Sequence, residues 1–277
     1  MVWSTYKEKV KLLSERMVDA QRPIRILDAI KWPNAVEEQL RKSKFKEMPQ
    51  LGKDYYETLD LGFDPSAKLE EFADIIKSIK EIMGGTDELA QLMVTNCEEY
   101  QDVVRMLKVR GTKEFYEYSK KLYGSPKGYF LDGKTTINDV ARSMYDIFSI
   151  IGDRVLGETL VEDLGAEAVV SALNKRFDDY FHDNTVRAKI SDGIVADSAA
   201  GGDVVKIREG AIFAKRDIDI LEVHEGWVHV GTTLNGTNQH VAKFLSKGPP
   251  RVASTQEGLA VLMEIFNFVS YPRRART

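Results

Sequence analysis

Hydrophobic side chains recur with a helical period through the first two thirds of the chain. From Asp64 to Met83 they return every three or four positions, and Pro65 stands at the first helical position. Thr136 with Asp139 is typical of another helix start. Helical segments are predicted over residues 65–83, 87–110, 112–124, 136–151 and 166–181. The pattern predicts a mostly helical N-terminal part.

The pattern changes near Asn184. Apolar and polar residues then alternate from Val186 to Ser191, which is the period of a half-exposed strand. Residues 198–202 read as a loop. Two more short strands are expected at 204–207 and 211–214, around a turn at Glu209-Gly210.

Together these elements predict an α+β fold. We expect a mostly helical N-terminal lobe, residues 1–183, and a small mixed β/α lobe, residues 184–277, joined in one compact unit. A chain of 277 residues with 43% hydrophobic and 30% charged residues is typical of a globular protein with a sizeable core.

The net charge and the number of cysteines limit the binding partners and the cellular compartment that we expect for this protein. A net charge of −4 gives no reason to expect nucleic acid or an anionic membrane as a partner. No apolar run approaches the roughly 20 residues of a membrane span, and no signal peptide is evident. The single cysteine, Cys97, cannot form an internal disulfide, which fits a reducing cytoplasm.

The chemistry-bearing residues follow the last predicted strand, in His224-Glu225-Gly226-Trp227-Val228-His229. This stretch holds two of the 4 histidines and follows a capped apolar segment, residues 217–223, that is typical of a helix start. A His-Glu pair with a second histidine downstream is typical of zinc hydrolases, where imidazoles hold the metal and the carboxylate activates water. The alternative is a surface helix with two unrelated histidines.

The spacing of His224 and His229 is five, whereas zinc helices usually use four. Each residue of an α-helix turns by about 100°, so positions five apart point about 140° away from each other. A turn of π-helix brings such positions back to one face. Gly226 lies where this distortion is absorbed, and glycine accepts unusual backbone angles at little cost. The spacing therefore predicts a distorted, π-type turn if both histidines bind one metal.

A second motif, Gln256-Glu257-Gly258-Leu259-Ala260, follows downstream. Together with HExxxH and Asn235-Gly236 it resembles the bacterial "flavohemoglobin expression-modulating QEGLA motif proteins", a family that includes the eukaryotic microtubule-associated tyrosine carboxypeptidases. Similar segments upstream are LDAIKWP at 27–33, CEEY at 97–100 and LYGSP at 122–126. Members of this family generally continue well beyond the QEGLA block, so we expect a C-terminal part to be missing here.

The resemblance implies a zinc metallopeptidase. His224 and His229 match the family's imidazole ligands, Glu225 its general base, and Glu257 its third ligand. Chemistry also requires such a third residue, because a catalytic zinc takes three protein ligands and keeps one position open. His240 and Glu264 are the reserve candidates for that position.

Glu257 also has an ordinary alternative role. With Ser254 as the N-cap, Glu257 would be the third residue of a capping box ahead of an apolar helix. Spacing by itself favours the capping role, and the resemblance favours the ligand.

Two functions from different classes are open at this point. The first is a zinc carboxypeptidase that hydrolyses a C-terminal bond of a peptide or protein, with Glu225 as general base. The second is a catalytically silent metal-binding module with a regulatory or protein-interaction role. Glu225 favours the enzyme, because structural zinc needs no base, and the missing C-terminal part favours the module.

A carboxypeptidase also has to bind the free carboxylate of its substrate. A guanidinium does so through a bidentate pair, and Arg251, stiffened by Pro249-Pro250, is the candidate. A solvated loop arginine is the alternative, and Lys189 is the reserve. The strands that precede the HE helix are either plain sheet or an edge that pairs with an extended peptide.

Overall fold

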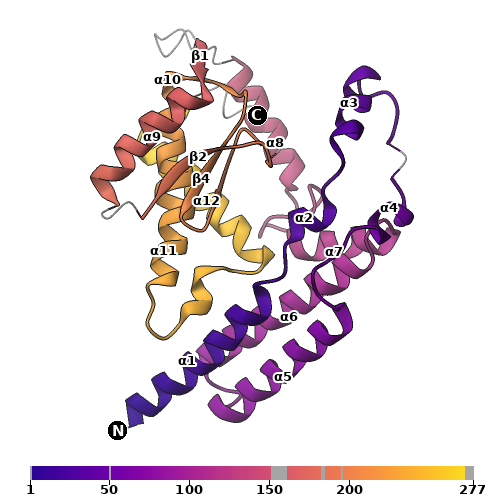
Figure 1. The fold of residues 1–277 in the computed structure, drawn as a ribbon, viewed down its shortest axis with the longest axis vertical. Helices are drawn as coiled ribbons and strands as arrows, with labels where there is room; N and C mark the ends of the chain where they lie inside the picture. Colours follow the sequence, from indigo (N-terminus) through magenta and orange to yellow (C-terminus); the bar gives the residue numbers. More distant parts are fainter. Residues whose placement is uncertain (1, 50, 151–160, 182–184, 195, 272–277) are drawn as a thin grey trace. The chain divides into compact units, whose positions relative to one another are not determined.

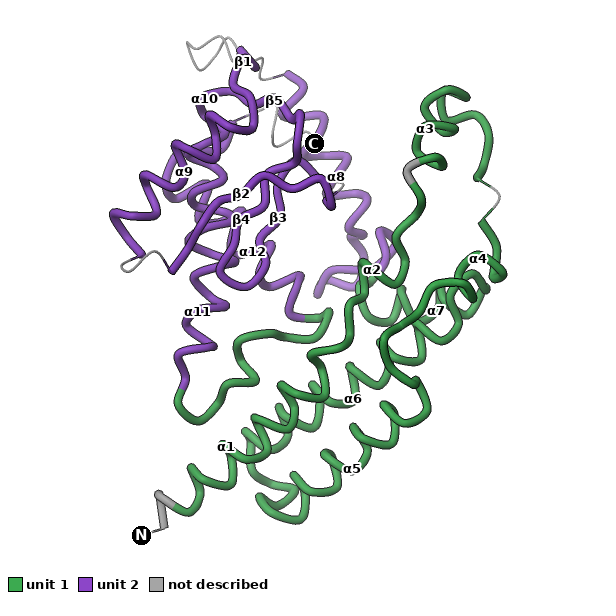
Figure 2. The backbone as a smooth tube through the Cα atoms, viewed as in Figure 1, with its two compact units in different colours: residues 1–124, 240–251 green, residues 125–239, 252–277 purple. Residues whose placement is uncertain are grey.

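The computed structural model describes residues 2–49, 51–150, 161–181, 185–194 and 196–271. These form two compact units, which Figure 2 shows in different colours: unit 1 is 1–124 with 240–251, and unit 2 is 125–239 with 252–277. The predicted α+β class is confirmed. Segments of the two units alternate along the chain, so their boundaries differ from those of the predicted lobes 1–183 and 184–277. The division into these two lobes stays a prediction.

Unit 1 is built around three long helices. They are α1 (Val2–Gln21), α5 (Pro65–Met83) and α6 (Glu88–Lys108), and they lie side by side in Figure 1. Shorter helices accompany them: α2 (Ile26–Ile30), α3 (Asn34–Lys42), α4 (Lys53–Glu57), α7 (Lys113–Tyr123) and the 3₁₀ turn η4 (Lys243–Ser246). Their apolar faces form one core, which includes the fully buried Leu13, Ile79 and Val103.

Two of the long helices in unit 1 begin with an aspartate cap. The carboxylate of Asp64 accepts a hydrogen bond from the backbone N–H of Ala67 at 2.7 Å, directly ahead of α5. Asp87 does the same for Ala90 at 2.7 Å, ahead of α6. Each cap satisfies a backbone donor that the first turn of a helix leaves without a partner.

Unit 2 carries the strands, in two small sheets. In the first, β2 (Arg187–Ser191) pairs in parallel with β4 (Val204–Arg208), which pairs antiparallel with β3 (Ser198–Gly201). In the second, β1 (Glu162–Gly165) pairs antiparallel with β5 (Ile212–Ala214). The strand order β2-β4-β3 makes β3 an edge strand.

One sequence prediction about the strands needs correction, and another is confirmed. Residues 198–202 were predicted to be a loop, but Ser198–Gly201 is β3, because these small residues pair with the second edge of β4. The turn at Glu209-Gly210 is present, with Gly210 at φ +73. The strands on its two sides, however, belong to different sheets.

The helices of unit 2 cover and follow these sheets. They are α8 (Ile137–Ile150), α9 (Ala166–Tyr180), α10 (Lys215–Leu221), α11 (Gly231–Thr237) and α12 (Pro250–Phe266), whose residues from 252 on belong to this unit. The capping pair before α8 is confirmed: Thr136 Oγ1 accepts from the Asp139 N–H at 3.1 Å, and Asp139 accepts from the Thr136 N–H at 3.0 Å. Ile151, the predicted end of this helix, lies outside the described residues.

The core of unit 2 joins helix α9 to the sheet and to the histidine segment. Leu173 and Phe177 of α9 are fully buried, together with Val205 and Ile207 of β4 and Val230. Burial of apolar side chains is the main source of stability where a helix packs on a sheet in this way.

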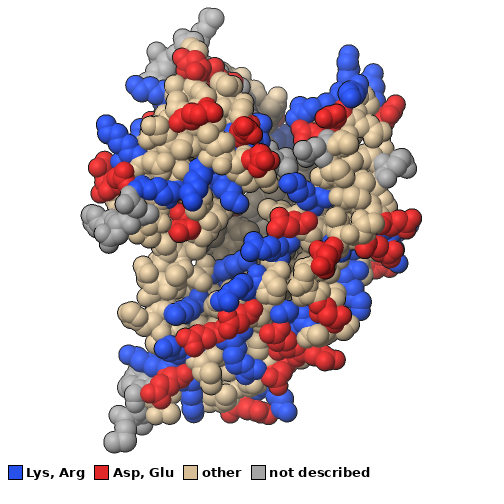
Figure 3. Space-filling view, viewed as in Figure 1, with Lys and Arg blue, Asp and Glu red and all other residues tan. Residues whose placement is uncertain are grey.

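The visible face of unit 1 carries charges of both signs (Figure 3). On the face of unit 1 visible in Figure 3, Lys and Arg are mixed with Asp and Glu. Exposed helical pairs such as Lys53–Glu57, at 3.1 Å, contribute little to stability. Within the described ranges, no helix combines the length and the apolar content needed to cross a membrane.

Candidate metal centre

The HExxxH segment lies within one continuous helical rod of unit 2. Helix α10 starts at Lys215, two residues before the predicted capped segment 217–223, and the Ala214 N–H donates to Asp217 Oδ2 at 2.8 Å. The rod then passes into a π-helix, η3 (Glu222–Val230), and on into α11. The N–H of Gly231 donates to the carbonyl of Gly226, five residues back. The π-type turn predicted from the spacing of the histidines is therefore confirmed.

Helix α9 holds this turn by ionic and aromatic contacts. Arg176 pairs with Asp219 at 2.7 Å and with Glu222 at 2.6 Å, at the entry to the π-helix. The rings of Tyr180 and Trp227 meet edge to face, with centroids 5.0 Å apart. Contacts with α9 therefore stabilise the π-helix in addition to its own backbone hydrogen bonds.

Gly226 has a different role from the one predicted. Its backbone is not among the positive-φ residues of the described chain, so an unusual backbone angle is not the reason for glycine here. Instead, a Cβ on Gly226 would lie 2.5 Å from Cε1 of the buried Phe177. The absent side chain lets α9 approach the π-turn closely.

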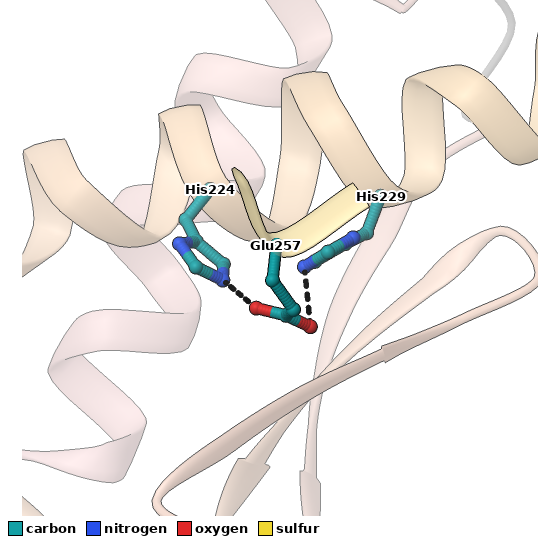
Figure 4. A group of neighbouring side chains, drawn as sticks. All are labelled: His224, His229 and Glu257. Atoms are coloured by element: carbon teal, nitrogen blue, oxygen red, sulfur yellow. Dashed lines mark ion pairs between the residues drawn. The ribbon is translucent and has the colours of Figure 1, made fainter. Parts of the chain in front are cut away.

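The π-turn brings both histidines to one carboxylate. His224 Nε2 lies 3.3 Å from Glu257 Oε2, and His229 Nε2 lies 3.5 Å from Glu257 Oε1. Figure 4 shows the two rings on one side of the helix with the carboxylate between them. The ring centroids are 4.9 Å apart with an interplanar angle of 72°. The two histidines therefore face one carboxylate and make up one candidate site, rather than two unrelated surface positions.

The donor set fits a zinc ion. The three ligand atoms lie within 4.8 Å of one another. Zinc bonds of about 2.0–2.1 Å in a tetrahedron separate neighbouring ligand atoms by about 3.3 Å. The 3.3 Å and 3.5 Å contacts are close to this separation, and two imidazoles with one carboxylate are a donor set that catalytic zinc uses.

Burial differs strongly across the three residues. His224 is buried, the His229 side chain is 17% exposed, and the Glu257 side chain is 61% exposed. The site is therefore anchored in the core on one side and open to solvent on the other. A catalytic metal needs such an open side for water and substrate.

Glu225 follows His224 in the chain, and its side chain is held by a strand. Its Oε1 accepts a hydrogen bond from Ser198 Oγ at 2.8 Å, and Ser198 is the first residue of β3. Glu225 itself is buried. The sequence did not point to Ser198, because the residue stands in a stretch of small residues that carries no strand pattern.

The structure distinguishes Glu257 from the two reserve candidates for the third ligand, His240 and Glu264, and bears on the capping role of Glu257. Helix α12 begins at Pro250, so Ser254 lies inside the helix and the capping-box interpretation of Glu257 is wrong. His240 is an exposed residue of unit 1. Glu264 is buried and lies 2.7 Å from Nδ1 of His224, on the opposite side of that ring from Glu257.

Arg251 has a partner within unit 1. Its guanidinium forms an ion pair with the buried carboxylate of Glu99, while the Arg251 side chain is 71% exposed. Burial raises the pKa of Glu99, and the charge of Arg251 opposes that shift. The reserve residue, Lys189, is exposed on β2. The role of either residue in binding a substrate carboxylate stays a prediction.

Comparison with known families agrees with this geometry. The family model described as "Microtubule-associated tyrosine carboxypeptidase" matches residues 38–277. The chain therefore belongs to this family, as its motifs indicated, and it is related to carboxypeptidases. The matched range includes both histidines, Glu225 and Glu257. No curated protein and no solved structure matches the chain.

Proposed function

We propose that this protein is a zinc-dependent metallopeptidase that acts as a carboxypeptidase on a peptide or protein C-terminus. The observation that carries the proposal is the convergence of His224, His229 and Glu257 across a π-turn, with 3.3 Å and 3.5 Å between the facing atoms. His224, His229 and Glu257 would hold the metal, and Glu225 would act as the base. The family match supports the peptidase class.

The chemistry divides between the metal and Glu225. Bound zinc would supply a Lewis acid that polarises the scissile carbonyl and makes water acidic enough to attack near neutral pH. Glu225 takes a proton from the attacking water as the water oxygen bonds to the carbonyl carbon. It then passes that proton to the leaving amine nitrogen as the C–N bond breaks. The products are a new C-terminal carboxylate and a released amine.

The position of Glu225 supports this role over a silent metal-binding module. Ser198 occupies one carboxylate oxygen, which leaves the other oxygen of Glu225 to accept the proton. A metal that only stabilised the fold would need no buried carboxylate held in this way beside its ligands. The module is therefore the second hypothesis.

The substrate is proposed to bind along the edge of the three-stranded sheet. Strand β3 is an edge strand, and it also carries the hydroxyl that contacts Glu225. An extended peptide that paired with this edge would run past the base. Arg251, with Lys189 in reserve, is proposed to bind the free carboxylate. The unpaired, buried Cys97 supports a reducing, cytoplasmic location.

One experiment tests the metal and the activity together. Protein prepared without chelator is analysed for metals and then incubated with two matched peptides, one with a free C-terminus and one amidated. We expect about one zinc per chain and release of the last residue from the free-acid peptide. A protein with His224 and His229 both replaced by Ala is expected to lose zinc and activity. A folded wild type that takes up no zinc would refute the proposal, and equal cleavage of both peptides would indicate an endopeptidase.

A further inference from the structure

Glu264 is a buried carboxylate that the proposed chemistry does not use. It is 2% exposed, and its Oε1 lies 2.7 Å from Nδ1 of His224. A carboxylate out of reach of water is costly unless a hydrogen bond or an opposite charge compensates it. The contact with the histidine ring is therefore the feature to explain.

We infer that Glu264 is a positioning residue for the metal centre, which fixes the ring of His224 so that Nε2 faces the metal. The inference rests on the proposed function of this site. In this inference Glu264 is ionised, so its oxygen accepts across the 2.7 Å contact and Nδ1 of His224 carries the proton and donates it. The lone pair that binds metal is then on Nε2, the atom that faces Glu257.

One helix supplies both carboxylates. Glu257 and Glu264 are seven residues apart in α12, and seven residues bring a helix back to within about 20° of the same direction. Glu264 reaches one nitrogen of His224, and Glu257 faces the other. A shift of α12 would therefore move the third ligand and the orientation of the first ligand together.

The two histidines are held unequally. His224 has a buried carboxylate behind it, whereas the ring of His229 is more exposed and, within the described part of the chain, contacts no carboxylate except that of Glu257. A carboxylate behind a metal-bound imidazole fixes its orientation and makes the ring a better donor. His224 is thus the preorganised ligand of the pair.

The test is the zinc affinity of Glu264→Gln and Glu264→Leu, measured by competition with a chromophoric chelator on metal-free protein. Loss of such a supporting carboxylate costs about 10–100-fold in metal affinity. We expect Glu264→Gln to bind zinc about tenfold more weakly, since the amide oxygen still accepts but carries no charge, and Glu264→Leu to bind more weakly still. Glu99→Gln removes a buried carboxylate from unit 1 and is expected to leave zinc affinity unchanged.

A second measurement on the wild type avoids any loss of folding in the variants. In ¹⁵N-histidine NMR of the zinc-loaded protein, His224 should keep a proton on Nδ1 and bind zinc through Nε2. Binding through Nδ1, or Glu264→Gln with wild-type affinity, would overturn the inference while leaving the metal centre intact. A wild type that binds no zinc would refute the metal centre itself.

Discussion

The ring of Phe177 fills the space where a side chain at position 226 would lie, because a Cβ on Gly226 would come within 2.5 Å of Phe177 Cε1. Phe177 is fully buried and packs in the core that α9 shares with the sheet. The ring therefore has little room to move aside. This contact links the packing of unit 2 to the turn that brings His224 and His229 together.

Replacing Gly226 by Ala is expected to disturb both stability and metal binding. Overpacking against Phe177 should lower the free energy of unfolding by about 1–3 kcal/mol, measured by urea denaturation. Zinc affinity should fall by about tenfold, because the π-turn has to shift. In the double variant Gly226→Ala with Phe177→Leu, the smaller side chain should restore part of the zinc affinity.

Gly258→Ala is the matched control for this substitution. Gly258 lies within α12, and apart from its chain neighbours and the nearby backbone of its own helix no atom lies within 4 Å of a Cβ built on it. Alanine should stabilise the helix there by about 0.5–1 kcal/mol. If Gly226→Ala were as stable as Gly258→Ala, the close approach of Phe177 would not be the reason for glycine at 226.

Substitutions of Glu225 and Glu257 should have different effects if Glu225 is the general base and Glu257 is a metal ligand. Glu225→Gln is expected to keep zinc and to lose hydrolysis by roughly a hundredfold or more, because the amide cannot take the proton. Glu257→Gln is expected to weaken zinc binding itself. Metal analysis and peptide cleavage on both variants check the assignment, and exchanged phenotypes would show that the roles are reversed.

Ser198→Ala should affect turnover without affecting the metal. The hydroxyl holds one oxygen of Glu225 at 2.8 Å, and a hydrogen bond to a charged group is worth about 1.5–3 kcal/mol. We expect kcat to fall roughly tenfold. KM and zinc affinity should change little, and Ser198→Thr, which keeps the hydroxyl, should stay near wild type. Equal losses in Ala and Thr would point to packing of β3 instead.

Arg251→Ala tests the proposed anchor for the substrate carboxylate. If Arg251 binds that group, the variant should lose activity on the free-acid peptide and keep the low activity on the amidated one. Glu99→Gln is the control, because it removes the ion-pair partner of Arg251 and keeps the Arg251 guanidinium. A loss shared by both variants would assign Arg251 a structural role, and Lys189→Ala would then be examined in the same assay.

Cys97 should report on folding of unit 1. The residue is fully buried, and burial raises the pKa of its thiol to about 12. The thiolate is the reactive form, so a raised pKa leaves very little of it at pH 8. A thiol reagent at pH 8 should therefore label the native protein far more slowly than protein unfolded in urea. Rapid labelling of the native protein would contradict the packing around α6.

The sequence by itself determined the local features of this protein. The capped starts of α5, α6 and α8 depend on side chains within three residues of the backbone groups they satisfy, so short motifs predict them. The π-turn was also predictable, because five-residue spacing and helical geometry leave few ways to direct both histidines at one metal. The family motifs, read together, indicated the residues of the candidate site.

Only the tertiary structure decided which residues support that site. Ser198 reaches Glu225 across 27 positions, and Glu264 reaches His224 across 40. Gly226 is required by the ring of Phe177, and not by its own backbone angle. Strand β3 forms because β4 offers a second edge to pair with. Each of these contacts depends on how separate elements pack in three dimensions, and periodicity along the chain carries no record of such packing.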